Sequence, residues 1–237
     1  DYTPSAGTIV TAKFSYDGNY LAVALNNKSI VFLSGGPTFN QSIKYVINTG
    51  QTISDIDFSS SSNGSKLLVC YSGNNSYDVF TNYLNATSNI NTATTAQIKK
   101  CKFTKNDSVA YIDNGNALKI IGAGGTVTTN FAGSAYSIFD VRMTPGTIKF
   151  IAGGANANSY YGTDPTTTMA ANSYSPVTAP ASNSGTACYA GDGQYYAFAN
   201  TGSEKKVYIF ADATNVLYDV FGNPNASILS CEFTHNG

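Results

Sequence analysis

The chain repeats one short pattern six times. In each copy a strand-like segment ends in a large apolar residue, a turn follows, and a second apolar segment begins. The residues that end the first segment, which we call the anchor residues, are Phe14, Phe58, Phe103, Met143, Tyr189 and Phe233. Their spacings are 44, 45, 40, 46 and 44 residues. A period of this length with several strands per unit is typical of β-propeller blades.

Each copy contains room for four strands. In the first copy, apolar runs predict strands over 8–14, 20–25, 29–33 and 42–47, with a two-residue hairpin turn at Asp17-Gly18. The next two copies and the fifth predict strands over 55–58, 66–72, 76–80, 88–93, 98–103, 108–113, 117–122, 125–131, 186–190, 194–199, 205–211 and 215–221. The fourth copy is poor in large aliphatic residues after Ala152, so there we expect two weak outer strands and a long loop. No segment has a sustained helical period, and no helix is expected.

The predicted fold is therefore all-β: a propeller of four-stranded antiparallel blades, with five full repeats and the start of a sixth. We expect one domain over 1–237, divided into repeats at about 8–50, 51–93, 94–134, 135–182, 183–225 and a partial 226–237. Open sheet edges are a liability that closure removes. Either the chain is a piece of a longer one, or 226–237 lends strands to another blade or to another subunit. Strand donation between subunits would build a filament.

The charge of the chain excludes some partners. Thirteen basic and 14 acidic residues leave a net charge of −1, and only 11% of the residues are charged. A nucleic-acid-binding protein needs a basic stripe, and the cluster Lys99, Lys100, Lys102 and Lys105 is divided between two faces by strand alternation. No apolar run approaches the roughly 18 residues of a membrane-spanning helix. We expect neither nucleic-acid binding nor membrane insertion.

Seven N-x-S/T sequons indicate a chain that carries covalent N-glycans outside the cytosol, extracellular or at the cell surface. They lie at Asn27, Asn40, Asn63, Asn74, Asn85, Asn106 and Asn225. Asn27 and Asn74 follow the second predicted strand of their repeats, and Asn63 and Asn106 lie in predicted strand-to-strand turns, where a glycan is accessible. The chain begins DYTPSAG with no signal-peptide core, which fits a processed chain and equally a cytosolic one.

The four cysteines lie at related positions of the repeat. Cys101 and Cys231 come two residues before an anchor residue, Cys188 comes one residue before, and Cys70 ends the second strand of the second repeat. Neighbouring repeats could then pair Cys70 with Cys101 and Cys188 with Cys231. The alternative is four small buried thiols, because free Cys packs as a small hydrophobe. No spacing fits a metal site, and no metal or other cofactor is expected.

Few residues are candidates for catalysis, and we expect the chain not to be an enzyme and to have no catalytic residues. The only histidine, His235, lies in a predicted turn, which argues against a Ser-His-Asp triad. Paired carboxylates serve glycosidases, but Asp55, Asp57, Asp113, Asp140, Asp192 and Asp212 are interpreted as turn and cap residues. Tyr71, Tyr77, Tyr160, Tyr161, Tyr195 and Tyr196 could stack on sugars, although strand tyrosines usually serve packing.

The segment Phe14–Ala24, FSYDGNYLAVA, resembles the start of WD40-type propeller repeats. The likeness extends along the chain as a period but is specific only in the first two strands of each repeat. The chain has no tryptophan and no Gly-His pair, so the hydrogen-bonded tetrad of many WD40 blades is missing. It looks like a divergent, secreted propeller-repeat protein of the kind found in some single-celled eukaryotes. The resemblance implies a non-catalytic scaffold.

These observations lead to one expected function and two alternatives. The expected function is a structural or adhesive extracellular glycoprotein whose partners are other protein subunits, including copies of itself in filaments. The first alternative is an intracellular WD40-like scaffold for protein–protein interactions. The second is a carbohydrate-binding, lectin-like propeller.

Overall fold

The structure, a computed structural model, describes most of the first half of the chain and the strands of the second half. The described residues are 7–15, 17–34, 42–59, 66–83, 89–94, 96–103, 108–115, 117–121, 127–131, 136–144, 147–154, 159–163, 172–174, 184–190, 194–200, 206–211, 213–214, 216–222, 228, 231 and 233.

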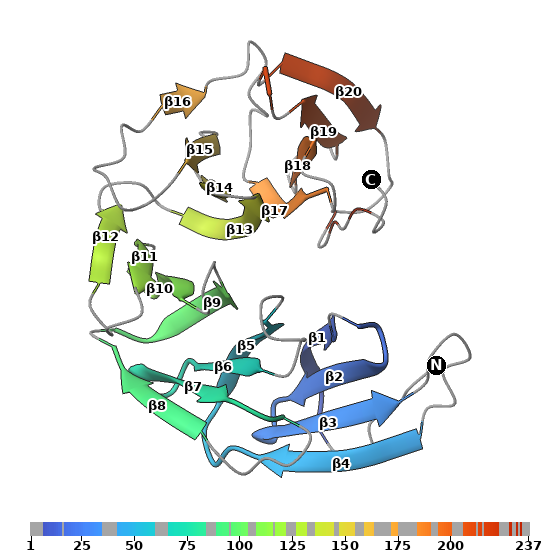
Figure 1. Cartoon of the computed structure of the whole chain (residues 1–237), viewed down its shortest axis with the longest axis vertical. Helices are drawn as coiled ribbons and strands as arrows, with labels where there is room; N and C mark the ends of the chain where they lie inside the picture. Colours follow the sequence, from blue (N-terminus) through green and yellow to red (C-terminus); the bar gives the residue numbers. More distant parts are fainter. Residues whose placement is uncertain are drawn as a thin grey trace. The chain divides into compact units, whose positions relative to one another are not determined.

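The described strands form five four-stranded antiparallel sheets, and no helix occurs among these residues (Figure 1). Sheet 1 contains β1 (Ile9–Phe14), β2 (Tyr20–Leu25), β3 (Ser29–Ser34) and β4 (Ser42–Asn48). Sheet 2 contains β5 (Ile53–Phe58), β6 (Leu67–Tyr71), β7 (Ser76–Phe80) and β8 (Asn89–Ala93). Sheet 3 contains β9 (Ile98–Phe103), β10 (Val109–Asp113), β11 (Leu118–Ile121) and β12 (Val127–Phe131).

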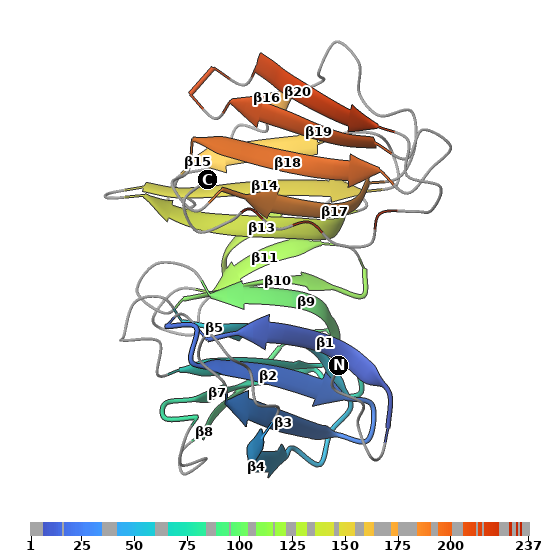
Figure 2. The same cartoon turned by 90° about the vertical axis from the view of Figure 1, so that its right-hand side faces the viewer.

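The last two sheets follow the same plan. Sheet 4 contains β13 (Tyr136–Thr144), β14 (Thr147–Gly154), β15 (Ser159–Thr163) and β16 (Asn172–Tyr174). Sheet 5 contains β17 (Ser184–Tyr189), β18 (Tyr195–Asn200), β19 (Lys206–Ala211) and β20 (Val216–Gly222). In every sheet the strands are hydrogen-bonded in chain order, as Figure 2 shows for β17 to β20. The prediction of an all-β chain with four strands per repeat is confirmed.

The turn between β1 and β2 differs from its prediction. The Asp17-Gly18 pair predicts a two-residue hairpin turn, but the connection between the two strands runs from Ser15 to Asn19. The Ser15 carbonyl accepts from the Gly18 N–H at 2.9 Å, and Gly18 has a φ of 70°. Asp17 accepts from Ser15 Oγ at 2.6 Å and from the Asn19 N–H at 3.1 Å. These side-chain hydrogen bonds stabilise a longer loop than backbone propensity alone suggests.

The chain divides into two compact units, which we describe separately. The first comprises 1–114 with 121–126, and the second comprises 115–120 with 127–237. Within the first unit the first strands of successive sheets, β1, β5 and β9, lie side by side, and within the second β13 lies beside β17. The single domain expected from the repeats stays a prediction.

Each sheet has two faces, and the repeat makes them distinguishable. We call the face that carries the anchor residue the anchor face and the other the opposite face. Phe58 and Val69 on the anchor face of sheet 2 pack on Ala24 and Phe32 from the opposite face of sheet 1. In the same way Phe103 and Tyr111 of sheet 3 pack on the opposite face of sheet 2, against Leu68, Cys70 and Tyr77. Successive sheets of the first unit are therefore joined by the same kind of apolar interface.

An aromatic cluster fills the anchor face of sheet 5. Tyr189, Tyr196, Phe198, Tyr208 and Phe210 are all buried there. The rings of Tyr196 and Phe210 are stacked with centroids 5.2 Å apart, and Tyr189 meets Tyr196 edge-on at 5.8 Å. Such pairs add to the free energy gained by burying the rings. Aromatic residues at alternate positions of β18 and β19 thus identify the buried face of this sheet.

Candidate functional site

Two features of the molecule bear on function: the turns that contain sequons and the junctions that contain disulfides. Of the seven predicted glycosylation sites, Asn27 and Asn74 are described, and both are exposed. Asn40, Asn63, Asn85, Asn106 and Asn225 lie outside the described residues.

The Asn27 sequon forms the turn from β2 to β3. Asn27 Oδ1 accepts from the Ser29 N–H at 3.2 Å and from Ser29 Oγ at 2.5 Å, which closes a turn of the Asx type. The Lys28 N–H donates to the Leu25 carbonyl at 3.2 Å, and Lys28 has a φ of 71°. Ser29, the hydroxyl residue of the sequon, is buried as the first residue of β3. The acceptor asparagine is thus on the surface while its serine belongs to the sheet.

The Asn74 sequon has the corresponding place in sheet 2. It lies in the turn from β6 to β7, and its hydroxyl residue Ser76 is the buried first residue of β7. The Ser76 N–H donates to the Asn74 carbonyl at 2.9 Å. Both described sequons therefore present an exposed asparagine next to a serine that starts the third strand of its sheet. A bulky glycan needs this kind of exposure.

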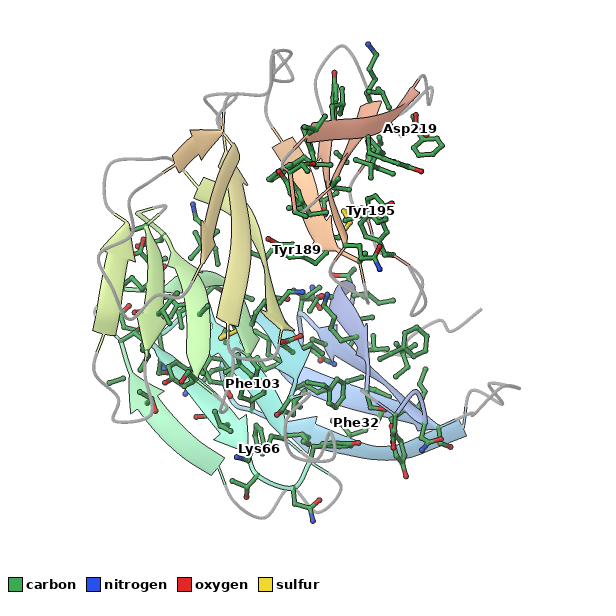
Figure 3. All side chains as sticks on the ribbon, turned by 45° about the horizontal axis from the view of Figure 1, so that its top comes forward. Phe32, Lys66, Phe103, Tyr189, Tyr195 and Asp219 are labelled. Carbon is green, nitrogen blue, oxygen red and sulfur yellow. A yellow bond between two sulfur atoms is a disulfide. The ribbon has the colours of Figure 1, made fainter. Side chains whose placement is uncertain are left out.

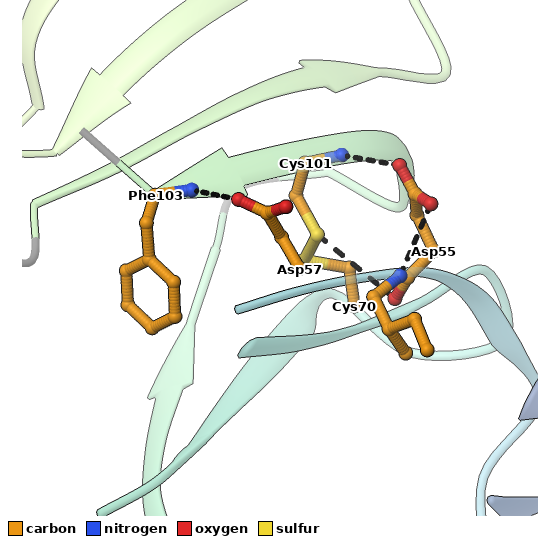
Figure 4. The surroundings of a disulfide bond; sticks show 6 residues. Asp55, Asp57, Cys70, Cys101 and Phe103 are labelled. Carbon is orange, nitrogen blue, oxygen red and sulfur yellow. Dashed lines mark hydrogen bonds between the residues drawn. A yellow bond between two sulfur atoms is a disulfide. The ribbon is translucent and has the colours of Figure 1, made fainter. Parts of the chain in front are cut away.

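The first disulfide joins sheet 2 to sheet 3 (Figure 4). Cys70 of β6 is bonded to Cys101 of β9, with Cα atoms 6.5 Å apart, and both residues are fully buried. This is one of the two pairs that aligning the repeats favours. The bond crosses the interface between the opposite face of sheet 2 and the anchor face of sheet 3.

Two carboxylates hold the edge of β9 beside this disulfide. β9 is the end strand of its sheet, so alternate backbone N–H groups point away from β10. Asp55 Oδ2 accepts from the Cys101 N–H at 3.1 Å, and Asp57 Oδ2 accepts from the Phe103 N–H at 2.8 Å (Figure 4). The carboxylates thereby satisfy backbone groups that would otherwise be costly to bury. The prediction that Asp55 and Asp57 are turn or cap residues is wrong, because both lie inside β5.

The charge on Asp57 is opposed by burial and favoured by two lysines. Burial raises the pKa of Asp57 above its ordinary value, while Lys102 and Lys13 act in the other direction. Lys13, Asp57 and Lys102 each come directly before an anchor residue, on the neighbouring strands β1, β5 and β9. Their position in the repeat accounts for their proximity. The sequence analysis did not predict that Lys13, Asp57 and Lys102 lie close together. A usable signal was the Asp-Ile-Asp alternation at 55–57, which places both carboxylates on the face of sheet 2 that carries Cys70.

The second disulfide joins β17 to the segment that contains the last anchor residue. Cys188 is bonded to Cys231, with Cα atoms 5.9 Å apart. This is the other pair favoured by the repeat alignment. Thr186 Oγ1 lies 3.8 Å from Cys231 Sγ, and because a disulfide sulfur carries no proton, the hydroxyl is the donor. Asp55 has the same repeat position as Thr186, and its carbonyl oxygen lies 4.0 Å from Cys101 Sγ.

The tyrosines considered for sugar stacking are mostly inside the protein. Tyr71, Tyr77 and Tyr196 are buried, and Tyr71 donates to Asp78 Oδ2 at 2.6 Å. Burial and the Asp78 carboxylate raise the pKa of Tyr71. Tyr195 is half-buried against Tyr218, with ring centroids 4.9 Å apart, and the side chains of Tyr160 and Tyr161 lie outside the described residues. Buried rings cannot stack on a sugar, so three of the six candidates serve packing.

Three further observations concern metal sites, membrane spans and carboxylates in the part of the chain that the structure describes. No group of three or more His, Cys, Asp or Glu residues within it is placed to hold a metal ion. Within the same residues no helix is long and apolar enough to span a membrane. Asp55 and Asp57 accept backbone hydrogen bonds, and His235, Asp192 and Asp212 lie outside the described residues.

The chain was compared with known proteins. No protein-family model matches it, and no curated protein matches its sequence.

Proposed function

We propose that this chain is a non-catalytic extracellular glycoprotein that serves as a structural or adhesive module and assembles with other copies of itself. One observation carries the proposal: all four cysteines are joined in two disulfides that link successive repeats. Disulfides form and persist in oxidising compartments and are rare in the cytosol. The exposed Asn27 and Asn74 supply two glycan acceptors that fit the same compartment.

We propose further that the five sheets are blades of a WD40-like propeller. Three features support this arrangement: the 40- to 46-residue period, the four-stranded antiparallel sheets in chain order, and the contacts between first strands of successive sheets within each unit. A fold of this kind is compatible with a role as a binding scaffold. It does not identify the partner, because such folds serve many functions.

A non-catalytic role is consistent with the structural hydrogen bonds of the acidic residues and with the burial of the tyrosines. Asp55 and Asp57, the closest pair of acids in the sequence, hold the backbone of β9. Glycosidases need two carboxyl groups that face a sugar instead. The buried Tyr71, Tyr77 and Tyr196 weaken the lectin alternative for the same reason, since the groups that would bind sugar are engaged inside the protein.

The native protein, purified without reducing agent, tests the proposal by mass spectrometry. We expect disulfide-linked peptides that contain Cys70 with Cys101 and Cys188 with Cys231. We also expect enzymatic removal of N-glycans in H₂¹⁸O to leave labelled aspartate at positions 27 and 74. Asn74→Gln should remove one glycan, whereas Asn75→Gln, a change at the exposed neighbour that leaves the sequon intact, should not.

Two results together would contradict the proposal. They are four thiols that can be alkylated in the native chain and the absence of glycan from Asn27 and Asn74. That combination would favour an intracellular interaction scaffold.

A further inference from the structure

The two described sequons each combine an exposed asparagine with a buried serine. Asn27 and Asn74 are exposed, whereas Ser29 retains 6% of its accessible surface and Ser76 retains 7%. The Ser76 hydroxyl oxygen itself is buried, and Ser29 Oγ is hydrogen-bonded to Asn27 Oδ1 at 2.5 Å. A finished glycan needs only the exposed asparagine. The enzyme that attaches it also has to contact the hydroxyl, because a serine or threonine at the third position defines the sequon.

The middle residue of each sequon is held by the segment that follows the fourth strand. Thr49, directly after β4, donates to the Lys28 carbonyl from its N–H at 2.9 Å and from its Oγ1 at 2.9 Å. Thr94, directly after β8, donates from its N–H to the Asn75 carbonyl at 2.7 Å. Both sequons are therefore fixed in place once the third and fourth strands of their sheet have paired.

The third strands are also anchored in the core. Ser29 begins β3, whose Phe32 is fully buried in the apolar cluster between sheets 1 and 2 (Figure 3). Ser76 begins β7, whose Tyr77 and Phe80 are buried. An enzyme that draws either serine into its active site would have to detach these side chains. Local opening is rare where it breaks buried apolar contacts.

The cluster that buries β3 forms only when two sheets meet. It combines Ala22 and Phe32 of sheet 1 with Ile56, Phe58 and Val69 of sheet 2. A two-stranded hairpin by itself is marginally stable in water. The hairpin that contains the Asn27 sequon therefore stays open to an enzyme until sheet 2 packs on sheet 1.

We propose that Asn27 and Asn74 accept their glycans only before sheets 1 and 2 form, so that folding closes both sites. In the transfer, the asparagine Nδ2 attacks the anomeric carbon of a lipid-linked diphosphate sugar. An N–C bond forms, the bond from that carbon to the diphosphate oxygen breaks with its electron pair on the diphosphate, and one Nδ2 proton passes to a basic group of the enzyme. The turn can keep the glycan, because the hydrogen bonds from Ser29 go to Asn27 Oδ1. This inference rests on the proposed function, to which it adds the order of two steps.

The test compares the folded and the unfolded chain as sugar acceptors. The full chain is made in bacteria without N-glycans, and peptide mapping verifies both disulfides. One sample stays native, and the other is reduced and alkylated so that it remains unfolded. Each is incubated with purified oligosaccharyltransferase and its lipid-linked sugar donor, and mass spectrometry follows occupancy at positions 27 and 74. We expect initial rates at both positions to be at least about tenfold lower in the native chain.

Two synthetic peptides are the matched controls. They have the sequences of residues 24–30 and 73–79, so they contain both sequons without the sheets. When they are added to the native chain in the same reaction they should be modified, which shows that the enzyme and the donor are active there. Circular dichroism before and after the reaction checks the folded state of both chain samples.

Two results would overturn the inference. One is modification of the native and unfolded chains at rates within about twofold of each other, which would mean that folding does not close the sites. The other is an unfolded chain that stays unmodified at both positions while the peptides are accepted. The assay starts from a chain without glycans, so neither result depends on the state of the natural protein. Absence of glycan from Asn27 and Asn74 of the natural protein would contradict the proposed function instead.

Discussion

The two disulfide junctions use corresponding positions of the repeat but different chemistry. Cys101 and Cys231 have the same place, two residues before an anchor residue, and each is bonded to the opposite face of the preceding sheet. At the first junction the Asp57 carboxylate accepts a hydrogen bond from the backbone N–H of Phe103 in β9, the first strand of the next sheet. At the second junction Cys188, in the same repeat position as Asp57, forms the covalent bond itself. One position of the repeat can thus join neighbouring sheets through either a carboxylate or a sulfur.

The surroundings of the two bonds differ as well. Cys70 and Cys101 lie in an apolar cluster with Leu68, Tyr77 and Phe103, and two carboxylates support them. Near Cys231 the described polar contact is the Thr186 hydroxyl. Among the described residues the first junction therefore has several independent contacts, and we expect the second to depend more heavily on its disulfide. Three changes test this difference, taken here from the largest expected effect to the smallest.

Removing either disulfide should have the largest effect. The cysteines are 31 residues apart in the first pair and 43 in the second, so chain entropy predicts a loss of about 4 kcal/mol for each, with a difference of only about 0.3 kcal/mol. The double variants Cys70→Ala/Cys101→Ala and Cys188→Ala/Cys231→Ala, compared by chemical denaturation, measure both losses. Hydrogen exchange should then rise throughout 228–233 in the second variant, while 98–103 stays protected in the first. Equal protection of the two segments would contradict the comparison.

Removing the Asp57 carboxylate should have an intermediate effect. In Asp57→Ala the Phe103 N–H loses its acceptor at a buried edge, which should lower the free energy of unfolding by about 1–3 kcal/mol. Asp57→Asn is the matched control, because an amide oxygen can accept the same hydrogen bond without a charge, and it should lose less than the alanine variant. Thermal and denaturant unfolding of both variants give the difference. Equal losses would mean that the hydrogen bond to Phe103 contributes nothing.

The stability of the wild-type protein relative to Asp57→Asn should also depend on pH. Because burial raises the pKa of Asp57, the folded state binds its proton more tightly than the unfolded state does. The contribution of this group to stability is therefore greatest below its ordinary pKa of 3.8 and declines as pH rises through the raised value. The stability of wild type relative to Asp57→Asn should fall over that window and be constant above it. An opposite slope would show that Lys102 and Lys13 outweigh burial.

Transferring a carboxylate to the second junction should have the smallest effect. Thr186 has the repeat position of Asp55, so Thr186→Asp should offer an acceptor to the backbone N–H of Cys231. We expect a gain of about 0.5–1.5 kcal/mol in the free energy of unfolding, together with slower exchange of that N–H. Thr186→Asn controls for the charge. A loss of stability in both variants would show that the strands of the two junctions are not aligned in the same way.

Much of the fold could be predicted from the sequence because its signals are local. The predicted strands 20–25 and 66–72 correspond closely to β2 (Tyr20–Leu25) and β6 (Leu67–Tyr71), and β19 begins within one residue of its predicted start. The longer turn after Phe14 was missed because side-chain hydrogen bonds from Asp17 compete with the backbone preference of an Asp-Gly pair. The site was less accessible to prediction. The role of Asp55 and Asp57 depends on Cys101 and Phe103 of β9. Each of these residues lies 46 positions further along the chain than the carboxylate that it donates to.

The sequence by itself determined the period, the strand composition of each repeat and the corresponding positions of the cysteines. These properties follow from residue spacing, since strands alternate and repeats recur whatever surrounds them. Only the tertiary structure decided which anchor residues are buried. Phe14, Phe58 and Phe103 have the same place in the repeat, yet Phe58 and Phe103 each retain 8% of their accessible surface and Phe14 retains 53%. Burial is a property of the neighbouring sheet, and no pattern within a single repeat specifies it.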